Sequence, residues 1–414
     1  MMKKFFSIYT LLALLTLGAC TSEVDDVFDK SASQRIEDAI ANDLSVLRGA
    51  SNGWVMEYYP SSTLTYGGYT MLVRFGTDGE AQVACDLFSK DLVATSVYEV
   101  KQSMGPMLTF DSYNEIFHFF SEPANELGIG DRGYGMEGDY EFLIMECSEE
   151  QVVLRGQKTG NKIVMKPVPT GLTWTEYLGS VKSVTSEAYP AAYDVLVNDV
   201  LQYSVVQKYR KFILVNSDGS QLALPFVYTT TGIKFYEPLS VGTQTIQTME
   251  WDASQMAYVS GNVVIKAQEL PTGYHRYEEF VGDYVFVYGN GNSMTSVALR
   301  EELFNESFIM EGFPLDIRVL YKADTGMIGL ESQQLSDNIY LCAWSLADGG
   351  YLTAGEGVGM EGSMYEEDGS YVVYFGDNGV WGRDTDSFIA YDYSSGGSAF
   401  QIPYVIGMVK IVNE

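Results

Sequence analysis

The sequence predicts a mainly β protein, built from antiparallel sandwich or barrel-like modules with a few short helices. Three hairpin-turn segments point to this fold class: residues 76–79 (Gly-Thr-Asp-Gly), 216–219 (Asn-Ser-Asp-Gly) and 323–326 (Ala-Asp-Thr-Gly). Each separates two short runs rich in β-branched and aromatic residues, which is the pattern of an antiparallel hairpin. Helical spacing of apolar residues is confined to residues 31–49 and to two stretches of the middle, 173–180 and 188–209.

The first residues have the pattern of an export signal, which we assign to residues 1–19. Lys3 and Lys4 precede an apolar run, residues 5–17, that is too short to cross a bilayer as a permanent helix. Residues 17–20 (Leu-Gly-Ala-Cys) resemble the bacterial lipobox. The resemblance implies cleavage before Cys20 and attachment of several fatty acyl chains such as palmitate, enough for stable anchoring. A plain secretory signal with a coincidental cysteine is the alternative.

We expect five segments along the chain. After the signal, residues 20–30 form an acidic tether, followed by an N-terminal β-rich domain with a leading helix (31–168). A middle α+β segment (169–270) and a C-terminal β-rich domain (271–414) complete it, with prolines near both boundaries. Ser31 and Gln34 form a capping box for the first helix. We expect residues 116–120 to form a strand with His118 facing away from its phenylalanine neighbours.

Acidic residues outnumber basic ones 55 to 25, for a net charge of −30. Such a charge repels phosphate backbones, so nucleic acid is not an expected partner. Cys85, Cys147 and Cys342 cannot all pair with one another, and no Cys-x-x-Cys spacing occurs. We interpret these three cysteines as small buried apolar residues.

Known catalytic motifs are missing from the sequence. The chain has two histidines, His118 and His275, and neither belongs to a zinc-protease motif; a nucleophile elbow and a phosphate loop are also lacking. A pair of carboxylates for glycoside hydrolysis stays open, because sequence spacing does not show which acids face each other. The protein is therefore more readily interpreted as a binding protein than as an enzyme.

A few residues are candidates for ligand or metal binding. Residues 366–369 and 384–386 bring acidic side chains together and could hold structural calcium, but acidic turns explain them better, and we expect no other cofactor. Trp381, between two glycines in a loop, is the candidate for ligand contact. We expect Trp54 and Trp344 to be buried in strands.

Several segments together resemble a family of Bacteroidetes surface lipoproteins of unknown function. They are the lipobox, the acidic tether, residues 28–32 (Phe-Asp-Lys-Ser-Ala), residues 53–59 (Gly-Trp-Val-Met-Glu-Tyr-Tyr), and residues 73–75 (Val-Arg-Phe) with the turn after them. The resemblance is strongest before residue 170. It implies a location on the outer membrane, lipid-anchored and at the cell surface. It also implies association with TonB-dependent nutrient import, with importer components and a polymeric nutrient as partners.

Three hypotheses about function follow. The first is a non-catalytic accessory or binding protein for capture and import of a glycan or peptide nutrient. The second is a carboxylate-dependent glycoside hydrolase, and the third is a structural component of the cell surface. Two segments that share Gly-Asp-Tyr-x-Phe, residues 138–142 and 282–286, leave open whether the β modules arose by duplication.

Overall fold

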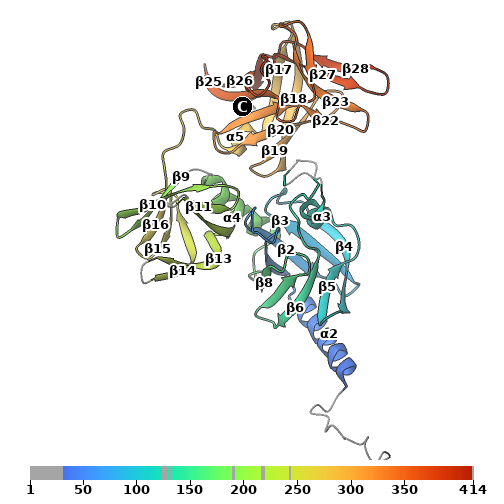
Figure 1. Ribbon diagram of the computed structural model, residues 1–414, viewed down its shortest axis with the longest axis vertical. Coiled ribbons are helices and arrows are strands. Elements are labelled where there is room, and N and C mark those ends of the chain that lie inside the picture. Colours follow the sequence, from blue (N-terminus) through green and yellow to red (C-terminus); the bar gives the residue numbers. More distant parts are fainter. Residues whose placement is uncertain are drawn as a thin grey trace, which may run out of the picture.

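The computed structural model describes residues 31–123, 129–130, 133–188, 192–215, 220–241 and 244–412. The predicted signal, Cys20, the acidic tether and the turn at residues 216–219 lie outside the described residues. Within these ranges, no helix has both the length and the apolar character needed to span a membrane. The predicted fold class is confirmed: antiparallel strands dominate, and most of them close into barrels (Figure 1).

The first barrel is an eight-stranded meander in which each strand pairs with the next and the last pairs with the first. The predicted hairpin at residues 76–79 joins its second and third strands, whose register runs from Met71 opposite Cys85 to Phe75 opposite Ala81. Its strands are β1 (Trp54–Tyr58), β2 (Tyr69–Phe75), β3 (Glu80–Cys85), β4 (Ala94–Gln102), β5 (Pro106–Phe110), β6 (Glu141–Cys147), β7 (Val152–Gly156) and β8 (Lys162–Pro167).

Two helices accompany the first barrel. The predicted N-terminal helix is confirmed as α2 (Ala32–Gly49), and Ser31 and Gln34 form its capping box. The expected strand at residues 116–120 is wrong: this segment is the helix α3 (Glu115–Ser121). The reason is local, because the side chain of Asn114 accepts hydrogen bonds from the backbone N–H groups of Ile116 and Phe117 and so caps a helix.

The second barrel is again an eight-stranded meander closed between its first and last strands. The helix α4 (Trp174–Glu187) precedes it, as predicted for residues 173–180 and extending further. Its strands are β9 (Ala192–Val197), β10 (Val200–Gln207), β11 (Lys211–Val215), β12 (Gln221–Tyr228), β13 (Gly232–Val241), β14 (Gln244–Asp252), β15 (Ala257–Ser260) and β16 (Val263–Ala267).

The expected helical stretch at residues 188–209 is wrong, because β9 and β10 occupy it. Asn198 and Asp199 both adopt positive φ, 50° and 62°, and form the tight turn between the two strands. Two consecutive residues with positive φ favour a type I′ hairpin and interrupt a helix. The apolar residues of this stretch fit both helical and strand periodicity, so the Asn-Asp pair is the deciding signal.

The third barrel has an inserted second sheet. The helix α5 (Tyr277–Phe280) precedes it, and the predicted hairpin at residues 323–326 joins two of its strands. The barrel strands are β17 (Gly282–Tyr288), β18 (Ser293–Leu303), β19 (Ser307–Glu311), β20 (Ile317–Lys322), β21 (Met327–Glu331), β25 (Gly359–Glu367), β26 (Ser370–Asp377) and β29 (Gly407–Lys410). The inserted sheet has β22 (Gln333–Gln334), β23 (Ile339–Ser345), β24 (Tyr351–Thr353), β27 (Ser387–Asp392) and β28 (Gly397–Ile402).

The unit that recurs is a helix followed by an eight-stranded barrel, in the order α2, α4 and α5 before β1, β9 and β17. The Gly-Asp-Tyr-x-Phe segments do not occupy equivalent places in this unit. Residues 138–142 lead into the sixth strand of the first barrel, whereas residues 282–286 begin the first strand of the third. This short motif therefore does not mark the repeat.

Candidate functional site

The second barrel has one closed end and one open end. At the closed end, Val181, Val184 and Ala188 of the α4 region belong to the same core cluster as Tyr193 and Phe226 of the barrel. At the opposite end, inside the barrel and next to the β9–β10 turn, lies a cavity of about 450 Å³. Fifteen residues line it: Val195, Val197, Asn198, Val200, Gln202, Tyr203, Val205, Phe212, Leu214, Leu222, Leu224, Leu239, Ser240, Val241 and Ile265. We call this end the mouth.

Strand alternation builds the wall of the mouth. In β9, the alternate residues Val195 and Val197 both point inward. In β12, the alternate residues Leu222 and Leu224 also point inward. The deepest lining residue with an aromatic ring is Phe212, which is fully buried. The walls therefore consist of branched aliphatic side chains projecting from strands whose other face meets solvent.

The chemistry of the lining is uncharged. None of the fifteen lining residues is Asp, Glu, Lys, Arg, His or Cys, although the whole chain carries a net charge of −30. The hydrogen-bonding side chains are Asn198 in the β9–β10 turn, Gln202 and Tyr203 in β10, and Ser240 near the end of β13. The lining of the mouth is therefore suited to holding an apolar group.

Large apolar side chains continue the lining outward onto the surface. Val200 is 59% exposed, Leu201 57% and Leu222 47%. An apolar cavity of a few hundred Å³ with few polar groups is the usual form of a ligand site. Apolar surface beside such a cavity commonly marks a place of contact with another molecule.

The closed end is fixed to the first barrel by a buried ion pair. Arg210, in the β10–β11 turn, places Nη1 2.5 Å from Oδ2 of Asp86, and Nη1 also donates to the carbonyl oxygen of Gly68 at 3.1 Å. Its guanidinium carbon lies 4.0 Å from the ring centroid of Tyr69. A Cβ on Gly67 would lie 2.0 Å from the backbone oxygen of Arg210, so this close approach requires glycine.

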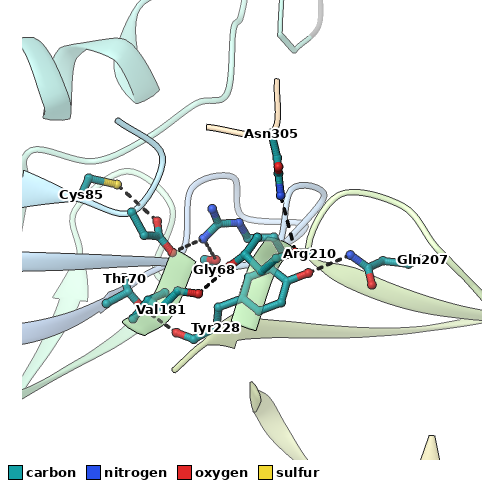
Figure 2. Close-up of polar contacts among 10 residues, drawn as sticks. Gly68, Thr70, Cys85, Val181, Gln207, Arg210, Tyr228 and Asn305 are labelled. Carbon is teal, nitrogen blue, oxygen red and sulfur yellow. Dashed lines mark hydrogen bonds and ion pairs between the residues drawn. The ribbon is translucent and has the colours of Figure 1, made fainter. Parts of the chain in front are cut away.

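Further polar contacts surround Arg210 (Figure 2). The hydroxyl of Thr70 donates to the backbone oxygen of Tyr228 at 2.6 Å, and Gln207 donates to the Tyr228 hydroxyl at 3.0 Å. The Thr70 hydrogen bond thus joins the first two barrels beside the Arg210–Asp86 ion pair, and the Gln207 hydrogen bond holds Tyr228 within the second barrel. Figure 1 places β10 on the side of the second barrel that faces away from the first.

The third barrel joins the same junction through its β18–β19 connection. The backbone N–H of Phe304 donates to the carbonyl oxygen of Leu87 at 2.7 Å, and Nζ of Lys182 lies 2.5 Å from Oε1 of Glu301. Burial raises the pKa of the nearby Glu306 carboxyl to about 7, and the Arg210 charge acts in the opposite direction. All three barrels therefore meet at the closed end of the second barrel.

The residues predicted as sites lie away from the mouth. Trp381 is half-buried and packs against the core of the third barrel. Residues 366–369 span the end of β25 and the turn to β26, in which Asp368 and Gly369 have positive φ. Asp386 accepts the backbone N–H groups of Leu346 and Ala347, both at 2.9 Å. Over the described ranges, no group of three or more His, Cys, Asp and Glu side chains could hold a metal ion.

The tryptophan, cysteine and histidine residues singled out from the sequence mainly make packing contacts. Trp54 is fully buried as expected, whereas Trp344 is partly exposed. Cys85, Cys147 and Cys342 are free thiols; the first and last are buried and the second is half-buried. His118 lies in α3 and stacks on the ring of Tyr140, with centroids 5.5 Å apart.

The lining residues of the mouth were not predicted as a site. Their sequence signal is weak, since Val197, Val200 and Leu214 are ordinary strand residues. The informative feature is that apolar side chains are exposed at the strand ends next to the Asn198–Asp199 turn. Their exposure can be assessed only when the structure of the closed barrel is known.

Comparison with known proteins identifies two families along the chain. A family model described as a domain of unknown function, DUF4302, matches residues 24–253. A second model, also described as a domain of unknown function, DUF4987, matches residues 259–391. No curated protein matches the chain.

Among solved structures, the chain is similar at a low level to transferrin-binding protein B. Intact Ap-TbpB with its N and C lobes is 10% identical, with 86% of this chain and 74% of that chain covered and a TM-score of 0.14. A point mutant of the vaccine antigen from Haemophilus parasuis Hp5 is 9% identical, with 83% and 65% covered and a TM-score of 0.14.

Proposed function

The chain belongs to the DUF4302 family, whose model covers more than half of it, and from this premise we propose that it is a lipid-anchored, non-catalytic binding protein. Its ligand site is the mouth of the second barrel. In this proposal the protein is displayed on the outer membrane and assists the capture and import of a nutrient, together with importer components. The single observation that carries the binding role is the uncharged apolar cavity of about 450 Å³ at the mouth.

The chemistry of the mouth selects among nutrient ligands. A glycan needs many hydrogen-bonding groups and an aromatic face for stacking. The mouth offers four hydrogen-bonding side chains, one of them Tyr203, and two aromatic rings, in a wall otherwise built of valines, leucines and one isoleucine. Because most of the lining is aliphatic, the bound group in this proposal is apolar, such as a side chain of a peptide, rather than a glycan. The hydrolase hypothesis gains no support here, because the lining has no carboxylate.

The junction supports the same role by holding the mouth in place. Arg210, Asp86 and Lys182 fix the closed end of the second barrel against its neighbours. A rigid binding site loses less conformational entropy when its ligand binds.

Binding of an uncharged apolar fluorophore tests the site. N-phenylnaphthylamine is titrated against the full chain, and its fluorescence rises on entering an apolar cavity. We expect saturable binding that Leu222→Glu weakens by about tenfold or more, because the new carboxylate lies at the lip of an apolar cavity. Val206→Glu is the matched control, since Val206 is 55% exposed on β10 and does not line the cavity. Equal effects of the two variants, or no saturable binding, would refute the site.

The anchor is tested separately at Cys20. Loss of the thiol in Cys20→Ser removes the site of acylation, so we expect no incorporation of labelled palmitate and loss of the protein from the membrane fraction. Protease digestion of intact cells reports surface exposure of the unaltered protein. Co-purification from outer membranes tests the importer partner, and recovery of the chain without any importer component counts against that part of the proposal.

A further inference from the structure

A second cavity of about 450 Å³ lies beside the first barrel, against the flank of α2. Asn42, Ser45, Val46 and Gly49 form one wall, and their spacing of three or four positions places them on one face of the helix. The connection after α2, the β6–β7 turn and the segment after β8 form the remaining walls. The volume lies in the range of small-molecule sites.

The lining of this cavity is more polar than that of the mouth. Six of its thirteen residues have hydrogen-bonding side chains: Asn42, Ser45, Ser51, Asn52, Glu149 and Thr170. Glu149 is the one charged residue among the thirteen, and all of them lie within the described ranges. The hydroxyls of Ser45, Ser51 and Thr170 make no hydrogen bond within the described part of the chain, so they are available to a ligand.

Apolar groups lie next to these polar ones. Trp54 is fully buried and Val168 is 3% exposed, and both line the cavity together with Val46 and Pro167. A sugar has the same mixed character, because hydroxyl groups project from the edge of its ring and C–H groups cover its faces. Small-molecule sites combine apolar contact with a few placed polar groups that fix the orientation of the ligand.

Hydrogen bonds hold two of the connections that form the walls. The side-chain amide of Asn52 donates to the carbonyl oxygen of Pro169 at 3.2 Å and to that of Leu172 at 2.8 Å. The indole N–H of Trp174 donates to the backbone oxygen of Asn52 at 2.8 Å. The connection after α2 is thus fixed to the segment after β8. A site whose walls are already fixed loses less conformational entropy when a ligand binds.

We propose that this second cavity binds a neutral saccharide unit. The sugar hydroxyls pair with the hydroxyl and amide groups of the lining, and a C–H face of the ring lies against Trp54, Pro167 and Val168. Glu149 accepts a hydrogen bond from a sugar hydroxyl, and its charge, with the net charge of −30, repels acidic sugars. The inference goes beyond the proposed function, because the mouth takes an apolar group and belongs to another barrel.

Saturation-transfer NMR and hydrogen exchange of the full chain test the proposal. The probes are four neutral disaccharides: maltose, lactose, cellobiose and N,N′-diacetylchitobiose. We expect saturable binding of at least one, with slower exchange in residues 49–54 and 167–170. The same disaccharide with one hydroxymethyl group oxidised to a carboxylate should bind at least threefold more weakly. Binding of none of the four, or equal binding of the acidic form, would overturn the inference.

A pair of size-increasing variants on α2 locates the site. Gly49→Leu adds a side chain where a Cβ meets no atom within 4 Å, so it narrows the cavity without a clash. We expect it to weaken saccharide binding about tenfold or more. Ala41→Leu is the matched control, since Ala41 is exposed on the same helix and does not line the cavity. Its affinity should stay within twofold of the unaltered protein.

A smaller change tests one hydrogen bond. Thr170→Val keeps the shape of the side chain and removes its hydroxyl, and we expect about threefold weaker saccharide binding. Binding of N-phenylnaphthylamine at the mouth should be unchanged in all three variants, which shows that they are folded.

The outcomes are distinguishable from those of the proposed function. If a disaccharide binds at the second cavity and N-phenylnaphthylamine does not bind, this inference stands and the mouth fails as a ligand site. If the fluorophore binds and no disaccharide does, the inference is overturned and the mouth stands. The inference is also overturned if the disaccharide displaces the fluorophore or slows exchange at residues 195–203, or if Gly49→Leu and Ala41→Leu act equally.

Discussion

The first and second barrels share an eight-stranded meander but differ in what fills them. In the first, α3 inserts Ile116, Phe117 and Phe120 into the core, and the Tyr58 ring packs 5.7 Å from Phe117 and 5.2 Å from Phe120. In the second, α4 covers one end and the other retains a cavity. The difference teaches that the same β scaffold becomes a structural core or a binding site according to where the helices pack.

The junction between the two barrels should show the largest effect of a single substitution. Arg210→Ala leaves the Asp86 carboxylate buried without its partner, and we expect a loss of about 3–5 kcal/mol in the free energy of unfolding. Urea denaturation measures it. The double variant with Asp86→Ala should recover part of the loss, because no charge then stays buried. A loss below about 1 kcal/mol in the single variant would show that the pair does not hold the barrels together.

The filled barrel should tolerate truncation less well than the open one. Phe117→Ala removes a fully buried ring and should lower the free energy of unfolding by about 3–5 kcal/mol. Leu224→Ala truncates a half-buried side chain that already borders the cavity, so we expect only about 1 kcal/mol. Chemical denaturation compares the two, and similar losses would contradict the contrast between the barrels.

The closed and open ends should also differ in their response to pH. The pKa of Glu306 is raised to about 7 in the folded protein, so the folded state binds more protons than the unfolded state between about pH 4.5 and 7. Stability should therefore fall as pH rises through this window, by up to about 3 kcal/mol. Glu306→Gln should flatten this part of the profile and be the more stable protein at pH 8. An unchanged profile would refute the role of Glu306.

The mouth, by contrast, should bind an uncharged ligand equally well across this pH range. Its lining contains no acidic, basic or histidine side chain. We expect the dissociation constant of N-phenylnaphthylamine to change by less than about twofold between pH 5 and pH 8, measured by fluorescence titration. A large change would mean that a titratable group reaches the bound ligand.

Local signals in the sequence explain the part of the fold that was predictable. Turn residues and β-branched runs indicated the hairpins, and Ser31 with Gln34 indicated the start of α2. The errors arose where apolar spacing fits two structures. Residues 116–120 have strand-like composition, yet the Asn114 cap starts a helix there. At residues 188–209, the Asn198–Asp199 turn overrides helical spacing.

The site depends on contacts that no local pattern contains. The mouth is lined by residues from β9 to β13 and β16, which come together only when the barrel closes. Arg210 and Asp86 are 124 positions apart in the chain. Trp381 was chosen for its glycine-rich loop, but its environment is set by packing against the third barrel's core.

A crystal structure under xenon pressure tests the central contrast most directly, because xenon occupies apolar cavities without needing hydrogen bonds or charge. We predict xenon among Val195, Leu224 and Ile265 at the mouth of the second barrel, and none beside Phe117 in the first. Xenon absent from the second barrel, or present within the first, would contradict the assignment of the mouth as the ligand site.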